Sequence, residues 1–185
     1  MAISTTFIPP SSIIKNILFV SLVLLTLANC AGLDSKNMVA QVDETAAPFT
    51  TGQSIAKIEI RGEKEEVFGG PAFAQKDQII DAARATLRNS GLFTSVDEGQ
   101  GELRLEIIVR SQNQLDSMML EYTAVTTITY RFTDPSGKIV WFKTYETEFS
   151  SHAFSGATRT VEAREGSVRE NLASLVEGIS TSWKN

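Results

Sequence analysis

An apolar segment near the N-terminus constrains this chain of 185 residues more than any other feature. Residues 17–27 are almost all aliphatic or aromatic, and a polar leader with one positive charge, Lys15, precedes them. As a helix the segment would be only about 16 Å long, which is short of the ~30 Å hydrocarbon core of a bilayer. A short apolar run behind a weakly basic leader is typical of a removable export signal. The folded part must therefore form from the residues that follow.

The four residues that end this segment are Leu27, Ala28, Asn29 and Cys30. This order resembles the lipobox of bacterial lipoproteins, although Asn29 stands where that family usually has Gly, Ala or Ser. The resemblance implies a signal peptide over 1–29 and a diacylglycerol on the sulfur of Cys30, which becomes the first residue of the mature protein. Acyl chains such as palmitate would then anchor it durably. An uncleaved signal anchor and an ordinary secreted protein are the alternatives.

The residue after the cysteine bears on which membrane holds the protein. In the sorting scheme that this signal resembles, Asp at that position favours retention in the inner membrane, whereas here it is Ala31. The resemblance therefore implies the periplasmic face of the outer membrane. Cys30 is also the only cysteine, so no intramolecular disulfide can form, and a structural zinc would need ligands from His152 and carboxylates alone. We therefore predict no metal site, and the sequence shows no pattern that predicts a cofactor.

The charge of the chain argues against nucleic acid as a partner. The formal net charge is −5, and removal of 1–29 with Lys15 leaves −5 − 1 = −6. Nucleic acids and anionic membrane surfaces both attract clustered Lys and Arg, which this sequence lacks. We therefore expect a membrane contact through the lipid anchor and a protein partner from the cell envelope, and the sequence leaves the oligomeric state open.

Small and polar residues without helical or strand periodicity follow the cysteine. We interpret 30–53 as the lipidated Cys30 with a flexible tether, whose average span would be roughly 25 Å. Residues 54–185 are then one periplasmic domain.

Hydrophobic periodicity predicts the elements of this domain. A short strand over 55–60 and a helix over 75–90 come first, then a two-faced strand over 103–110 and a loop over 112–117. A hairpin of two long strands turns at 134–137, and an amphipathic helix closes the chain, with Arg164 and Glu165 outside its apolar stripe. Val96 could add a short strand. The fold class we predict is α+β, a mostly antiparallel sheet of about four strands with two helices on one face.

Few residues could support catalysis. His152 is the only histidine, and the nearby hydroxyls of Ser150, Ser151 and Ser155 are its only local candidates for a catalytic pair. Sequence neighbours on an extended chain point to alternating faces, so we interpret His152 as an ordinary surface histidine. Four carboxylates, Glu59, Glu63, Glu65 and Glu66, alternate with cations, which is typical of a solvated strand edge. We predict no catalytic residues.

One apolar patch next to a predicted loop is a possible partner contact: Leu115, Met118 and Met119. Flexible Met side chains suit adaptable interfaces, but the same residues could simply begin the next strand.

The stretch from Leu103 to Trp183 resembles the small periplasmic lipoproteins of the YajG kind. The similarity lies in the strand over 105–109, the turn over 134–138 and the closing helix around 168–172. It implies a role in the envelope and no known catalytic residues. We therefore predict a non-enzymatic, membrane-anchored accessory module for envelope maintenance, assembly or transport. A carrier of an apolar ligand such as a lipid is the alternative, and a hydrolase is a weaker one.

Overall fold

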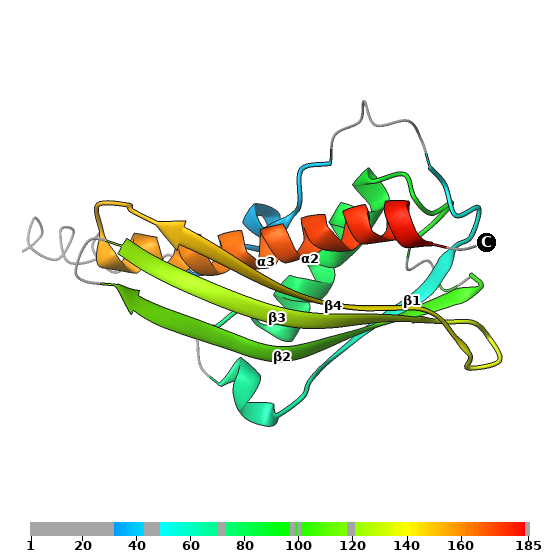
Figure 1. Cartoon of the computed structure of the whole chain (residues 1–185), viewed down its shortest axis with the longest axis horizontal. Helices are drawn as coiled ribbons and strands as arrows, with labels where there is room; N and C mark the ends of the chain where they lie inside the picture. The colour runs from blue at the N-terminus through cyan, green and yellow to red at the C-terminus, as the bar shows by residue number, and fades with distance from the viewer. Residues whose placement is uncertain are drawn as a thin grey trace, which may run out of the picture. The chain divides into compact units, whose positions relative to one another are not determined.

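The computed structural model describes residues 32–42, 49–69, 73–96, 99, 101–117 and 121–183. Residues Gly32–Asn185 form one compact unit. Its elements are η1 (Ser35–Met38), β1 (Ile55–Gly62), η2 (Glu65–Phe68), α2 (Lys76–Asn89), β2 (Leu103–Ser117), β3 (Glu121–Thr133), β4 (Ile139–Ser151) and α3 (Gly156–Ser182). The sheet has the order β1-β2-β3-β4, and α2 and α3 accompany it (Figure 1). The predicted α+β fold is therefore confirmed.

The antiparallel part of the sheet follows the predicted alternation. In β3 the even-numbered residues from Ala124 to Phe132 are all buried, and β4 returns beside them after a tight turn. Asp134 builds this turn because its carboxylate accepts hydrogen bonds from the backbone N–H groups of Ser136 and Lys138. Gly137 takes a positive φ of 85°, which a residue with a Cβ would adopt at a cost.

The predicted loop over 112–117 is wrong, because β2 continues through it to Ser117. A bulge between Val109 and Ser111 shifts the register, after which the strand stays paired with β3. The side chain of Gln112 then bonds the carbonyl oxygens of Val67 and Ala74. These residues looked like a loop because they are polar, but pairing with β3 satisfies their backbone, and the side chain of Gln112 bonds the segment that leads into α2.

β1 pairs with β2 in parallel, and α2 forms the crossover between them. Gly101 allows the chain to pass close to β1, since a Cβ there would lie 2.6 Å from the backbone nitrogen of Ala56. Val96, the possible short strand, makes an isolated parallel bridge to Ile55. α2 itself has the predicted limits: Gln75 and Gln78 form a capping box, and Gly91 follows with a φ of 65°.

One core unites the sheet and both helices. Buried aliphatic residues of α2, α3 and all the strands except β4 contribute to it, and one end is closed by four aromatic rings. The ring of Phe132 stacks on Phe93 and makes edge contacts with Trp141 and Trp183 at 5.3–5.8 Å between centroids. Because Trp183 directly follows α3, this cluster fixes the C-terminal end of that helix.

The predicted tether over 30–53 is not flexible throughout. Met38 and Ala40 are buried, and the backbone N–H of Ala40 donates to the hydroxyl of Thr86 in α2 at 3.0 Å. The hydroxyl of Thr51 donates to the backbone carbonyl of Leu92 at 2.9 Å. The correction has a simple cause: the fully buried Met38 and hydrogen bonds to both helices anchor a short segment that has no periodic pattern.

The burial pattern of β2 yields a stability prediction. Leu105 is fully buried in the core that also contains Leu172 and Leu175, whereas its neighbour Arg104 is exposed. Leu105→Ala is expected to cost ~2–5 kcal/mol of unfolding free energy, and Arg104→Ala no more than about 0.5 kcal/mol. Urea unfolding of the chain from Gly32 onward measures both, and equal losses would contradict the assignment of faces.

Candidate functional site

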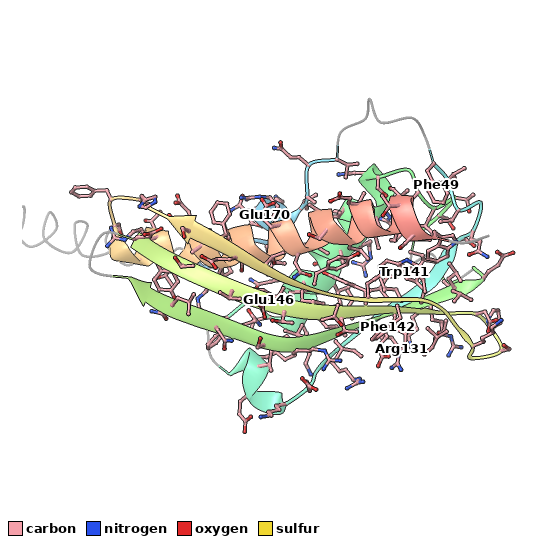
Figure 2. The ribbon with its side chains drawn as sticks, viewed as in Figure 1. Phe49, Arg131, Trp141, Phe142, Glu146 and Glu170 are labelled. Atoms are coloured by element: carbon pink, nitrogen blue, oxygen red, sulfur yellow. The ribbon has the colours of Figure 1, made fainter. Side chains whose placement is uncertain are left out.

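One face of the sheet is not covered by α2 or α3, and we call it the open face. Odd-numbered residues of β3 from Thr123 to Arg131 lie on it, since the even-numbered Thr126 and Tyr130 bond to α3. Pairing across the strands adds Glu106 of β2 and Phe142 of β4, which flank Arg131. Figure 2 shows Trp141 pointing toward α3, with Phe142 and Arg131 on the opposite side.

The middle of the open face consists of paired charges. Glu106 accepts from Arg61 at 2.7 Å and from Arg131, so one carboxylate joins β1, β2 and β3. Arg110 bonds both Glu63 at 3.1 Å and the hydroxyl of Thr129 at 2.6 Å. Pairs at this exposure contribute little to stability, but they fix the side chains in place. The surface is therefore preorganised.

Apolar side chains are exposed at both ends of this face. At the end near the 134–137 turn, Phe142 is 50% exposed and Val140 beside it 40%. At the other end Leu115, which pairs with Thr123, is 50% exposed. The sequence pattern indicates Leu115 as a partner contact but not Phe142. The four consecutive apolar residues at 139–142 could have predicted an exposed apolar side chain here. In a strand that has helices on one side only, part of any continuous apolar run is exposed.

The covered side of the sheet holds a buried polar cluster around Asn171 of α3. Its amide nitrogen donates to the carbonyls of Thr126 and Tyr145 and to the hydroxyl of Thr147, all within 3.1 Å. Its amide oxygen accepts from the hydroxyl of Tyr130 at 2.9 Å. Burial raises the pKa of Tyr130 well above 10, so this hydroxyl keeps its proton and donates. Every polar group named here has a partner, which is typical of a structural cluster.

Two charged residues of α3 that the sequence placed away from the core are buried. Arg164 stacks on the ring of Phe73 at 4.2 Å and donates to the hydroxyl of Tyr122 at 2.8 Å. Glu165 accepts from the backbone N–H of Asp34 and from the amide of Asn37. The predicted exposure of both residues is wrong for the same reason: segments distant in sequence cover this part of α3. They supply aromatic rings and a hydroxyl for Arg164 and N–H donors for Glu165.

The residues considered for catalysis do not come together. His152 is 70% exposed, and its imidazole lies 3.7 Å from the carboxylate of Glu121. The hydroxyl of Ser150 pairs with Thr123, that of Ser151 donates to Glu162, and that of Ser155 caps α3. Each serine thus bonds a group other than His152.

Two of the four candidate carboxylates, Glu59 and Glu63, are paired with cations. Lys57 lies 2.5 Å from Glu59 and holds the pKa of that carboxyl below its usual range, while Glu63 bonds Arg110. Within the described part of the chain, no three His, Cys, Asp or Glu side chains are close enough together to hold a metal ion.

Cys30, Met118 and Met119 lie outside the described residues, so the lipidation site and two thirds of the predicted partner contact stay predictions. Over the described ranges, no helix has the length and hydropathy to cross a membrane.

Surface cavities border the domain. One of about 520 Å³ lies between the N-terminal segment and α3 and is lined mainly by polar residues such as Lys36, Glu162 and Arg169. Another, of about 600 Å³, has Ile60 and Ile80 at its base among charged side chains. A carrier of an apolar ligand would need room between the sheet and the helices, where the described residues form a hydrophobic core of buried side chains.

Comparison with known proteins identifies the fold. No family model and no curated protein matches this chain. Among solved structures, a Xanthomonas campestris protein described by the family model DUF330 is 14% identical, with a TM-score of 0.61. That match covers 75% of this chain and 89% of the other. An uncharacterized protein is 10% identical with a TM-score of 0.52, covering 71% and 94% of the two chains.

A minor lipoprotein from Acinetobacter baumannii is 11% identical, with a TM-score of 0.44 over 68% of this chain and 92% of its own. A TM-score below 0.5 does not establish a common fold. At these identities the two matches with TM-scores of 0.61 and 0.52 show a shared fold alone, and they do not confirm the narrower resemblance to the YajG kind of lipoprotein.

The cluster around Asn171 leads to a second stability prediction. Asn171→Ala leaves the Tyr130 hydroxyl and the Thr126 carbonyl each without a bond that it makes in the native core. Because an unsatisfied buried polar group costs about 1–3 kcal/mol, we expect a loss of ~2–4 kcal/mol in a thermal or urea melt. Thr181→Ala is the matched control, since this exposed hydroxyl bonds only carbonyls of its own helix. A loss as large for the control would contradict the structural role of Asn171.

Proposed function

We propose that this chain is a lipid-anchored, non-enzymatic protein of the bacterial envelope that binds a protein partner through the open face. The observation that carries the proposal is the composition of that face. Exposed Phe142, Val140 and Leu115 stand at its ends, and fixed ion pairs occupy its middle. Large apolar anchors within a polar, preorganised surround are typical of protein interfaces.

The anchor part of the proposal depends on the sequence. The order Leu27, Ala28, Asn29, Cys30 behind a short apolar segment supports acylation of Cys30, and Ala31 supports the periplasmic face of the outer membrane. A protein held there meets its partners in two dimensions, so a modest interface is sufficient for association. The envelope process it serves, be it maintenance, assembly or transport, depends on which partner binds.

Charge on the open face indicates the kind of partner. Arg61, Arg104, Arg110 and Arg131 lie toward β1 and β2, whereas Glu146 and Glu148 lie on β4. Glu106 and Glu63 neutralise part of this positive charge, so the face is of mixed charge toward β1 and β2 and acidic on β4. A partner with the reverse arrangement of charges would be oriented by it.

Acylation is tested by Cys30→Ser. The variant is expected to lose palmitate labelling and to remain as an uncleaved precursor, because the sulfur that receives the lipid is absent. Metabolic labelling with palmitate and fractionation of the two membranes measure this. A variant that still labels and still fractionates with the outer membrane would disprove the anchor.

The partner surface is tested by photo-cross-linking in cells. We expect a benzoylphenylalanine in place of Phe142 or Leu115 to capture an envelope protein, because both side chains protrude from the open face. The same probe in place of Glu170 is the matched control, since this residue is exposed on α3, away from the open face (Figure 2). Capture from Glu170 but from neither open-face position would place the interface on the helical side and reject the proposal.

A further inference from the structure

The N-terminal end of the folded unit is fixed to both helices. The carbonyl of Leu33 accepts from the amide of Gln78 in α2 at 2.6 Å. The next residue, Asp34, donates its backbone N–H to Glu165 of α3 at 2.6 Å, and Glu165 is buried. The chain therefore leaves the domain at a defined point beside the first third of α3.

Only three residue steps separate this point from Cys30. A fully extended chain covers at most ~3.6 Å per residue, so Cys30 lies within about 11 Å of Leu33. A lipid on Cys30 would hold this part of the domain against the bilayer surface. Side chains exposed near this part of the domain would then contact the lipid.

Phe154 is the most exposed large apolar side chain of the described residues, with a relative exposure of 104%. It lies in the loop between β4 and α3, directly before Ser155, which caps the helix. The guanidinium of Arg159 donates to the carbonyls of Ala153 and Phe154 at 2.6 and 3.1 Å. These bonds fix the loop backbone, so the ring of Phe154 is held in the solvent by an ordered loop.

Phe154 and the point where the chain leaves the domain, at Leu33 and Asp34, both lie close to α3. Phe154 precedes the first turn of this helix, and Asp34 bonds Glu165 further along it. From Ser155 to Glu165 there are ten residues, which corresponds to about 15 Å along the axis of α3. Two points this close on the surface of one domain can both contact a flat bilayer. The loop and the anchored segment are therefore close enough together to contact one membrane.

We propose that Phe154 inserts into the interfacial layer of the bilayer that holds Cys30, so that the domain contacts the membrane at two points. This inference rests on the proposed lipid anchor. The short chain from Leu33 to Cys30 favours lipid as the group that covers Phe154, because a lipid on Cys30 would hold the loop that carries Phe154 close to the bilayer. Aromatic and aliphatic side chains are the groups that peripheral proteins bury at the boundary between headgroups and acyl chains.

The inference is tested with the full acylated protein carrying Phe154→Cys and an environment-sensitive nitrobenzoxadiazole label. In the acylated chain the sulfur of Cys30 is blocked, so the new thiol is the one that reacts. The protein is reconstituted into vesicles of phosphatidylethanolamine and phosphatidylglycerol. Phe142→Cys is the matched control, an exposed Phe at the far end of β4. We expect the label at 154 to shift its emission to the blue and to be quenched by nitroxide lipids, and the label at 142 to remain as in water.

Each other outcome overturns the inference. Labels that are water-like at both positions on protein that floats with the vesicles would reject insertion and leave the anchor intact. Shielding of position 154 only after an envelope extract is added would assign the ring to a protein partner. Failure of the protein to float would reject the anchor and the insertion together. Because Phe154 is fully exposed, its replacement leaves the core unchanged, and a circular-dichroism melt checks this.

Discussion

The attachment of α3 to β3 and β4 is the interaction on which the rest of the structure depends. At its centre a single amide, that of Asn171, satisfies groups of both strands and thereby fixes the position of the helix along the sheet. Gly166 and Gly178 allow close contact, since a Cβ at either would collide with the side chains of Phe149 or Tyr145. The N-terminal segment then binds to α3 through Glu165, and Trp183, directly after the helix, packs against Phe132 of β3. If the helix shifted by one turn, both attachments would be lost.

The sequence predicted those parts of the fold whose signals are local. Strict alternation in β3, the Asp134 turn and the glycine after α2 each determine nearby backbone, and the structure confirms them. The predictions that are wrong have a different cause. The extension of β2 past residue 111 and the burial of Arg164 both depend on groups brought in from elsewhere in the chain, such as Ala74 and Phe73. Periodicity carries no information about such contacts.

The same distinction applies to the candidate surface. Sequence patterning indicated that one side of each strand is polar, and it singled out Leu115. It could not indicate that Phe142 is exposed, because Trp141 and Phe142 are equally apolar neighbours and alternation alone does not say which of them faces the helices. The choice is made by α3, whose Ser182 hydroxyl accepts from the indole nitrogen of Trp141 at 3.1 Å. The tertiary fold thus decides which of two aromatic rings is available to a partner.

The ordered N-terminal segment changes what an anchor at Cys30 can do. A tether of more than twenty residues would let the domain rotate freely, whereas three residues beyond Leu33 leave it close to the bilayer. The strand β4 has 13 residues and so spans roughly 40 Å at ~3.3 Å per residue, with Phe154 just beyond one end and Phe142 near the other. With the first end at the proposed membrane contact, Phe142 would lie up to that distance from the bilayer. The anchor would then orient the open face as well as hold it, and a partner would approach along a surface that extends outward from the bilayer.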